Sequence, residues 1–369
     1  MQVLKAELHK LFIKRFFVIA VVVLIIVEGL TTFSAIRKSI VLDGPSLQVY
    51  KTYINKYSGK ITDEKKAEIE SLISSYQSVF DEIEKLNEDY AKDNISTEDY
   101  NKQIEKLSGY TDAMEGFNAF ERAYNTALST DNPLVDVTAW NCLFTGDSID
   151  IFFVLVLILL VISLVVHDEE TGINVLKFST KNGKKDIYFK QLFIVIITSF
   201  LLSILVSLTK FLTAKLTYGL NCYDAPVRCF EAFTFSSSET GVLKIFIVIS
   251  LLKSAGGVML SLVAMAVGCL TRTSLYTAFS TICSVYLPGY IFMESKLKYF
   301  IPLPTSLLMA EGYFKPEIIG KTVASGENYL FVMNSKVYLE LGLFAFLTLV
   351  VFAGLMVFTY MKLARRKNI

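Results

Sequence analysis

The chain has 369 residues, of which 53% are hydrophobic, and it carries a formal net charge of +1 at pH 7 with a mean hydropathy of +0.48. This composition argues against a series of soluble domains and is typical of a membrane protein. Several apolar runs approach or exceed the roughly 18–20 residues that cross a hydrocarbon core about 30 Å thick. Because backbone polar groups must be satisfied within each run, we expect an all-α polytopic membrane protein.

The apolar runs predict six membrane-spanning helices. Basic residues cluster before the first run and after the last, and by the positive-inside rule both termini are expected in the cytoplasm of a plasma-membrane protein. Residues 1–33 are predicted to form a basic interfacial helix and the first span, and residues 149–369 the other five. The predicted spans are Phe12–Phe33, Ile149–Val166, Ile187–Leu216, Val242–Leu270, Leu275–Met293 and Val337–Met361.

The segment 34–148, between the first two spans, is predicted to be a large extracellular helical domain. Apolar residues recur at steps of three and four over Ile69–Tyr90 and again over Tyr100–Leu128. Thr62 and Ser96 stand where these two helices would begin and can cap them. Two amphipathic helices joined by a short turn would form an antiparallel hairpin. It is either a stalk that faces a substrate or partner, or a self-packed insert.

Two later segments have distinctive compositions. Gly256 and Gly257 lie among small residues of the fourth span and would permit close contact between helices. The segment 294–336 is predicted to be external, with apolar stretches too short to span a membrane. There we expect short helices that lie on the outer leaflet or enter it as a re-entrant segment.

The sequence contains no recognisable catalytic constellation. It lacks the phosphate-binding GxxxxGK[ST] loop. No spacing of His, Cys and carboxylate residues is typical of a metal site. We therefore expect a chain that is not an enzyme, binds no metal and holds no cofactor of its own.

Four residues in or near the spans are candidates for special roles. Charges inside a membrane are costly, which makes Glu28 and Lys253 functional candidates. At a rise of about 1.5 Å per residue both lie roughly 25 Å from the inner face, so they could pair, or each could face a wet cavity separately. Cys222 and Cys229 share a predicted external loop with six residues between them. Both a disulfide and free thiols fit that spacing.

The loop 167–190, between the second and third spans, is the largest predicted cytoplasmic surface between helices. It is polar and contains turn residues, but its centre is amphipathic. By itself it would be an ordinary solvated connector or a place where a soluble partner contacts the membrane protein. Its apolar residues are Ile173, Val175, Leu176 and Phe178.

The pattern of this loop resembles that of ABC-transporter permeases of the type 2 (exporter) family. These have an E–G…S/T–G…K pattern between their second and third spans, matched here by Glu169, Glu170, Thr171, Gly172, Ser179, Gly183 and Lys190. The segment Lys5–Leu8 before the first span, the fourth span rich in small residues and the Pro-containing segment before the last span are similar to the family too. The chain departs from it in placing threonine before Gly172 and lysines, not arginine, after Gly183.

The resemblance covers the chain except the 34–148 insert and implies an exporter. Two permease halves, identical or homologous, would meet in the lipid bilayer around a dimer axis. A separate cytoplasmic ABC ATPase dimer would bind ATP and Mg, and it would receive a coupling helix from loop 167–190 with the amino-terminal helix beside it. No nucleic-acid partner is expected. External inserts in Gram-positive relatives go with antimicrobial peptide resistance, so the substrate would be such a peptide, a drug or a lipid-like molecule.

Two other functions remain open. In a mechanotransmission complex, the ATPase would move the helical hairpin to control an external partner without a substrate crossing the membrane. Alternatively, the chain would be a membrane scaffold or receptor with no ATPase.

Overall fold

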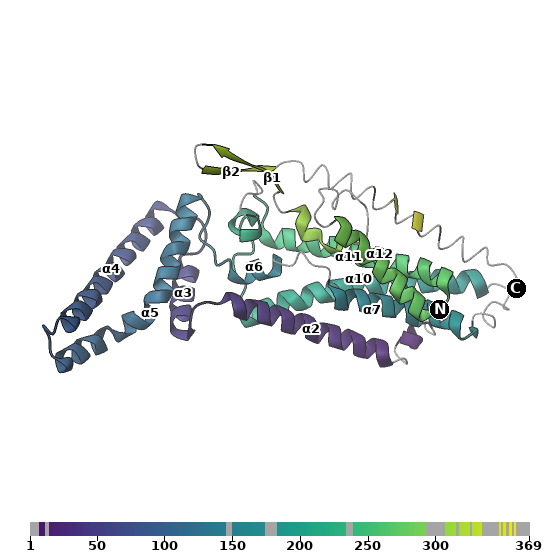
Figure 1. Ribbon diagram of the computed structural model, residues 1–369, viewed down its shortest axis with the longest axis horizontal. Coiled ribbons are helices and arrows are strands. Elements are labelled where there is room, and N and C mark those ends of the chain that lie inside the picture. The colour runs from purple at the N-terminus through teal and green to yellow at the C-terminus, as the bar shows by residue number, and fades with distance from the viewer. Residues whose placement is uncertain are drawn as a thin grey trace.

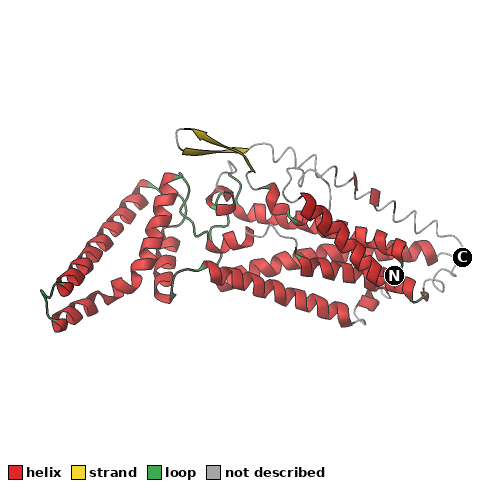
Figure 2. Ribbon diagram, in the orientation of Figure 1, coloured by secondary structure: helices red, strands yellow, loops and turns green. Residues whose placement is uncertain are grey.

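The computed structural model describes residues 7–11, 15–144, 150–173, 183–233, 239–292, 307–314, 317–324 and 327–333, with a few single positions after residue 346. These residues are helical apart from turns and one hairpin of two strands (Figure 2). The molecule is elongated, with a bundle of long helices in one part and a smaller helical lobe beyond one end of the bundle (Figure 1).

Four segments of the bundle are helices long and apolar enough to cross a membrane, as their composition predicts. They are Phe16–Ser39 in α2 (Arg15–Ser39), Ile151–Glu170, Ile187–Thr217 in α10 (Gly183–Thr217) and Val242–Thr271 in α11 (Val242–Thr271). A fifth helix, α12 (Ser274–Phe292), follows where the fifth span is predicted. The sixth predicted span, Val337–Met361, lies outside the described residues apart from single positions.

Glycines in α11 let this helix pack closely in the bundle, as the sequence predicts. A Cβ on Gly256 would lie 2.8 Å from Leu307 Cβ, and one on Gly257 would lie 2.7 Å from Ser203 Oγ in α10. Ser261 of α11 also lies 2.7 Å from the Ser199 hydroxyl of α10. In lipid the hydrophobic effect does not drive helices together, so close packing at small residues and hydrogen bonds between hydroxyl groups hold them in contact.

The second span is not one uniform α-helix. It consists of α7 (Ile151–Val161), a π-helical turn η1 (Ile162–Val166) and α8 (His167–Glu170). The His167 amide donates to the Ile162 carbonyl, a five-residue step that inserts one extra residue into the helix. The segment from α7 to α8 nevertheless continues without a break along the bundle.

The lobe consists of α3 (Gly44–Tyr57), α4 (Asp63–Ala91) and α5 (Thr97–Ser129). The predicted hairpin is α4 and α5, and its predicted caps are confirmed, because Thr62 accepts from Lys65 N and Ser96 from Asp99 N. The helix α3 was not predicted, although Asp43 caps it and a proline opens its first turn.

Aromatic side chains form the core of the lobe. Tyr76 of α4 stacks on Phe117 of α5 with ring centroids 3.9 Å apart, and Tyr53 of α3 meets Phe117 edge-on. Gly116 lies against the backbone of α3, since a Cβ there would be 2.0 Å from the Ser46 carbonyl oxygen. The three helices therefore share one core that the amphipathic stripes of α4 and α5 only partly predict.

A short helix, α6 (Thr138–Phe144), returns the chain from the lobe to the bundle. Its Trp140 is buried among aromatic rings and donates to the Asn221 carbonyl at 3.0 Å. The loop that contains Asn221 also holds two 3₁₀ turns, η2 (Val227–Cys229) and η3 (Glu231–Phe233).

The segment 294–336, predicted as short helices, agrees with that expectation only in part where it is described. Residues 307–308 and the 3₁₀ turn η5 (Ala310–Tyr313) are helical, whereas β1 (Glu317–Ala324) and β2 (Glu327–Met333) form an antiparallel hairpin. The β-branched and aromatic residues of β1 and β2 fit a strand as well as a short helix, and periodicity does not separate the two in runs this short.

Candidate functional site

The end of the bundle away from the lobe holds a buried polar junction, formed by Glu7, Lys10, Asp168 and Gln191. Lys10 Nζ lies 2.6 Å from Asp168 Oδ2 and 2.9 Å from both Glu7 carboxylate oxygens. Gln191 Nε2 donates to Glu7 at 3.1 Å and to the Leu164 carbonyl at 2.9 Å. Glu7, Asp168 and Gln191 are at most 3% exposed, and the single ammonium of Lys10, 25% exposed, bridges the two buried carboxylates.

This junction joins the amino-terminal segment to the base of loop 167–190. Glu7 and Lys10 belong to residues 7–11, which are helical, whereas Asp168 lies in α8 and Gln191 in α10. The described residues place Lys10 against Asp168 and Glu7 against Gln191, near the two ends of the loop, whereas the centre of the loop, where the resemblance implies a coupling helix, lies outside them. Composition alone gave no signal that Lys10 and Asp168 meet.

The predicted coupling residues near α8 make contacts within the chain. Glu170 accepts from the Ser274 amide at 2.5 Å and from its hydroxyl at 2.7 Å, so it caps the beginning of α12. Glu169 accepts from the Tyr188 hydroxyl at 3.2 Å. Thr171 ends α8, and Gly172 has a positive φ of 67° that glycine adopts without strain.

The remaining predicted coupling residues are only partly described. The side chain of Ile173 is exposed, at 41% of its full area. Lys190 lies in α10 and is partly exposed. Val175, Leu176 and Phe178 lie outside the described residues.

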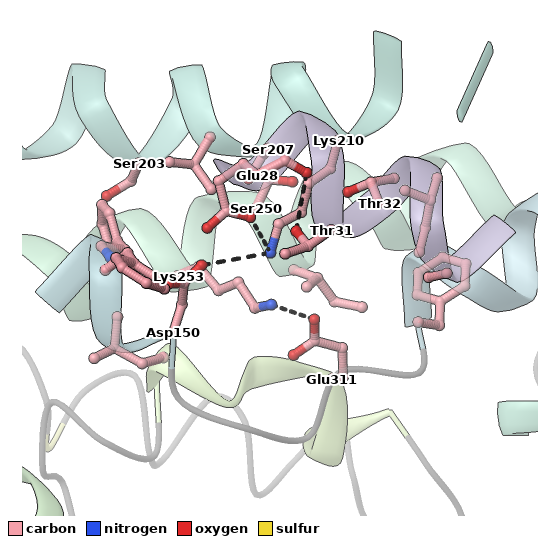
Figure 3. A pocket seen from close by; sticks show the side chains of 18 of the residues that line it. Glu28, Thr31, Thr32, Asp150, Ser203, Ser207, Lys210, Ser250, Lys253 and Glu311 are labelled. Carbon is pink, nitrogen blue, oxygen red and sulfur yellow. Dashed lines mark hydrogen bonds and ion pairs between the residues drawn. The ribbon is translucent and has the colours of Figure 1, made fainter. Parts of the chain in front are cut away.

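A cavity of about 510 Å³ lies between the bundle helices on the side of the lobe, and we call it the lobe-side cavity (Figure 3). Helices α2, α7, α10 and α11, together with α6 and η5, contribute to its walls. The charged residues that line it are Glu28, Asp150, Lys210, Lys253 and Glu311, and the aromatic ones are Phe144, Phe152, Phe153 and Phe246.

Three ion pairs link the walls of the lobe-side cavity. Lys210 Nζ lies 3.0 Å from Glu28 and 3.8 Å from Asp150, and Lys253 contacts Glu311. Both predicted intramembrane charges therefore line one cavity, but they do not pair with each other. The sequence could not identify their partners, because Lys210 and Glu311 are far along the chain from Glu28 and Lys253, respectively.

Asp150 is the fifth charged residue of the lobe-side cavity and was not predicted. Its Oδ1 accepts from the Phe153 amide at 3.1 Å and caps α7, which favours the ionised carboxylate at a helix N-terminus. Its Oδ2 lies 3.8 Å from Lys210 Nζ, beyond hydrogen-bond distance. The cap pattern before an apolar run was visible in the sequence, whereas the proximity to Lys210 was not.

Of the two states that the spacing of Cys222 and Cys229 left open, the structure has free thiols at both. Burial raises the pKa of the Cys229 thiol to about 11 and also raises the pKa of Cys222. The spacing permitted a disulfide, but spacing does not orient two side chains toward each other.

The lobe contacts the bundle through polar groups. Lys51 of α3 donates to the Tyr218 carbonyl at 2.5 Å, and its ammonium lies 3.7 Å from the centre of the Tyr218 ring. Asn221 donates to Asn55 at 2.7 Å. Partial burial lowers the pKa of Lys51. These contacts connect α3 directly with the end of α10 and the loop that follows it.

Comparisons with known proteins identify no relative: no family model, no curated protein and no solved structure matches the chain. Within the described residues, no group of three or more His, Cys, Asp or Glu side chains is placed to hold a metal ion. The bundle thus has a charged, partly apolar cavity at one end and, at the other, a buried junction in which Lys10 bridges two carboxylates.

Proposed function

We propose that the chain is the permease subunit of an ATP-binding-cassette exporter that moves an amphipathic substrate outward. It would have six membrane spans and act with a second permease half and a separate ATPase. The buried junction of Lys10 with Asp168 carries this proposal. It attaches the amino-terminal segment to the base of loop 167–190, where a partner that pushes on the loop would move both together.

The second span offers a path from the loop to the lobe-side cavity. The helical segment from Ile151 to Glu170 is continuous, with Asp150 in the cavity at one end and Glu170 at the other. Because its residues are hydrogen-bonded along the axis, a displacement of α8 would move Asp150. The π-helical turn η1 is a place where such a helix can change register, and π-turns are frequent at functional sites.

A mechanotransmission complex is the second candidate, and the contacts of α3 favour it. Lys51 and Asn55 bond to the backbone carbonyl of Tyr218 and the side chain of Asn221, respectively. A movement at the end of α10 would therefore reach the lobe. In this function no substrate would cross the membrane.

The test is purification of the tagged chain from its native membranes. We expect a nucleotide-binding ATPase subunit to co-purify, identified by mass, with ATP hydrolysis in the complex. Replacing Ile173→Asp should abolish recovery of the ATPase, because it puts a charge on the exposed apolar part of the loop. The matched control is Val41→Asp, since Val41 is 91% exposed and lies near the lobe.

Absence of any ATPase from the native complex would rule out both candidates and favour a scaffold or receptor. Glu170→Lys is a poorer probe of coupling than Ile173→Asp, because Glu170 also caps α12 through Ser274. Retention of the ATPase by the Ile173→Asp variant would show that the loop is not the docking surface.

A further inference from the structure

We propose that the lobe-side cavity binds an amphipathic cation, a molecule with one ammonium group on a hydrocarbon body. The proposal deepens the exporter function and rests on it for the route of the ligand. Binding itself depends only on the residues of this cavity. Four features of the cavity support it: the volume, the charged residues, the buried carboxylate of Glu311 and the exposed apolar side chains at the rim.

The size and walls of the cavity suit a small organic ligand. Its volume of about 510 Å³ falls within the roughly 300–1,000 Å³ of ligand pockets. Aromatic and aliphatic side chains line it, including Phe153, Phe246 and Val206, and a few polar groups converge on it (Figure 3). Apolar walls with few polar groups bind the body of a ligand by burial and orient its head by charge.

The charges in the cavity favour a cation. Three carboxylates, from Glu28, Asp150 and Glu311, face two ammonium groups, from Lys210 and Lys253. Lys253 contacts Glu311, whereas Lys210 is shared between Glu28 at 3.0 Å and Asp150 at 3.8 Å, and Asp150 and Glu28 also share a side-chain hydrogen bond. The two lysines thus serve three carboxyl groups, and one added ammonium would give each group a cation of its own. An anion would instead have to compete with a carboxylate for a lysine already paired.

The buried carboxylate of Glu311 independently favours a cationic ligand. Its side chain points from η5 into the cavity toward Lys253, and the residue is 2% exposed (Figure 3). Its Oε2 is buried and has no hydrogen-bond partner among the described residues. A buried carboxylate oxygen without a donor is unusual and costly. An ammonium group in the cavity would stabilise this carboxylate.

The rim of the cavity explains why the cation should be amphipathic. Ile151 and Phe152 line the cavity and are also 50% and 48% exposed. They begin the segment Ile151–Glu170, which is apolar enough to cross a membrane. A ligand that approaches from the lipid therefore meets apolar side chains before it meets Asp150.

The chain contains its own reporter of binding. Trp140 is its only tryptophan, and its ring lies 6.3 Å from Phe144 and 6.4 Å from Phe246, both of which line the cavity. The experiment titrates octylammonium into the full-length chain in lipid nanodiscs and follows tryptophan fluorescence together with the heat of binding. Octanol and octanoate, at matched concentrations, are the neutral and anionic probes.

We expect saturable binding of octylammonium and at least ten-fold weaker binding of octanol and octanoate. Asp150→Asn should weaken octylammonium binding about ten-fold, because a charge-assisted contact becomes neutral. Asparagine still caps α7, so folding is preserved. Glu311→Gln should weaken binding similarly. The control Asp131→Asn makes the same chemical change in a lobe turn, where asparagine tolerates the φ of 50°, and should leave affinity unchanged.

Equal binding of octanol, or tighter binding of octanoate, would overturn the proposal, as would unchanged affinity in both Asp150→Asn and Glu311→Gln. These results are independent of the partner ATPase. If octylammonium does not bind while an ATPase co-purifies, the cavity assignment fails and the exporter proposal stands. If octylammonium binds and no ATPase is found, the cavity assignment stands and the exporter proposal fails.

Discussion

Two half-buried thiols in the loop between α10 and α11, Cys222 and Cys229, show how the local environment controls the chemistry of one residue. Cys229 lies in a 3₁₀ turn, close to Phe230, which is fully buried. Desolvation disfavours the thiolate, and this effect outweighs the nearby Arg228 guanidinium, so the pKa of Cys229 rises to about 11 from an ordinary 9.0. A thiol with so high a pKa is a poor nucleophile near neutral pH.

Cys229 should therefore react slowly with maleimide. A pKa about two units above the ordinary value lowers the thiolate fraction at pH 7 roughly 100-fold, and the rate should rise about ten-fold per pH unit up to pH 10. The measurement is the labelling rate of the Cys229 peptide by mass spectrometry. The denatured chain is the control, and equal rates in folded and denatured protein at pH 7 would contradict the assigned environment.

At the scale of elements, close contact between helices depends on single glycines. Gly116 allows α5 to cross α3, because the Ser46 carbonyl occupies the position of a Cβ. Gly109, seven residues earlier in the same helix, has no atom within 4 Å of that position. Gly116 is thus required for the close crossing of α5 and α3, whereas Gly109 lies in open space, although both look alike in the sequence as glycines within a helix.

Gly116→Ala should destabilise the lobe by about 1–3 kcal/mol or more, since a methyl group would overlap a backbone oxygen that cannot move alone. Gly109→Ala should stabilise α5 by up to about 1 kcal/mol, because alanine favours a helix interior. Limited proteolysis of the full-length chain across α3–α5 would measure both. Slower cleavage of Gly116→Ala than of the unsubstituted chain would refute the close crossing.

At the scale of the whole molecule, the lobe divides into a base and a tip. The base holds the shared core of α3, α4 and α5, including Tyr76 and Phe117, and it contacts the bundle through Lys51. The tip is the outer part of the hairpin, where Tyr90 stacks on Tyr100 with centroids 4.3 Å apart. Since the hydrogen bonds of Lys51 and Asn55 to the bundle lie in the base, the tip can be removed without removing them.

A shortened hairpin separates the two proposed functions. Replacing Glu82–Gly109 with a short Gly-Ser turn retains Phe80 and Tyr110, both near Tyr76, and so preserves the aromatic core. An exporter should keep most of its transport, whereas a mechanotransmitter should lose its signal completely. Transport and signalling would be measured beside the variant Glu88→Ala, which breaks only an exposed ion pair worth at most about 1 kcal/mol. Complete loss of transport in the shortened chain would contradict the simple exporter.

Much of the architecture was predictable from local patterns. The four long apolar helices, the α4–α5 hairpin and the caps at Thr62 and Ser96 follow from hydrophobicity, periodicity and capping chemistry, which act between residues close in the chain. Periodicity did not predict the helix α3 because its apolar stripe is short, although Asp43 with Pro45 two residues later is typical of a helix start. The β1–β2 hairpin was missed because short apolar runs carry no clear period.

By itself, the sequence determined that the chain has helices suited to a membrane, that a helical insert follows the first of them, and that Glu28 and Lys253 are costly charges in need of compensation. Only the tertiary structure decided which groups compensate them, namely Lys210 and Glu311, and that Lys10 joins Asp168. The physical reason is distance along the chain. Helix formation and capping depend on neighbours within four residues, whereas an ion pair depends on how helices far apart in sequence pack together.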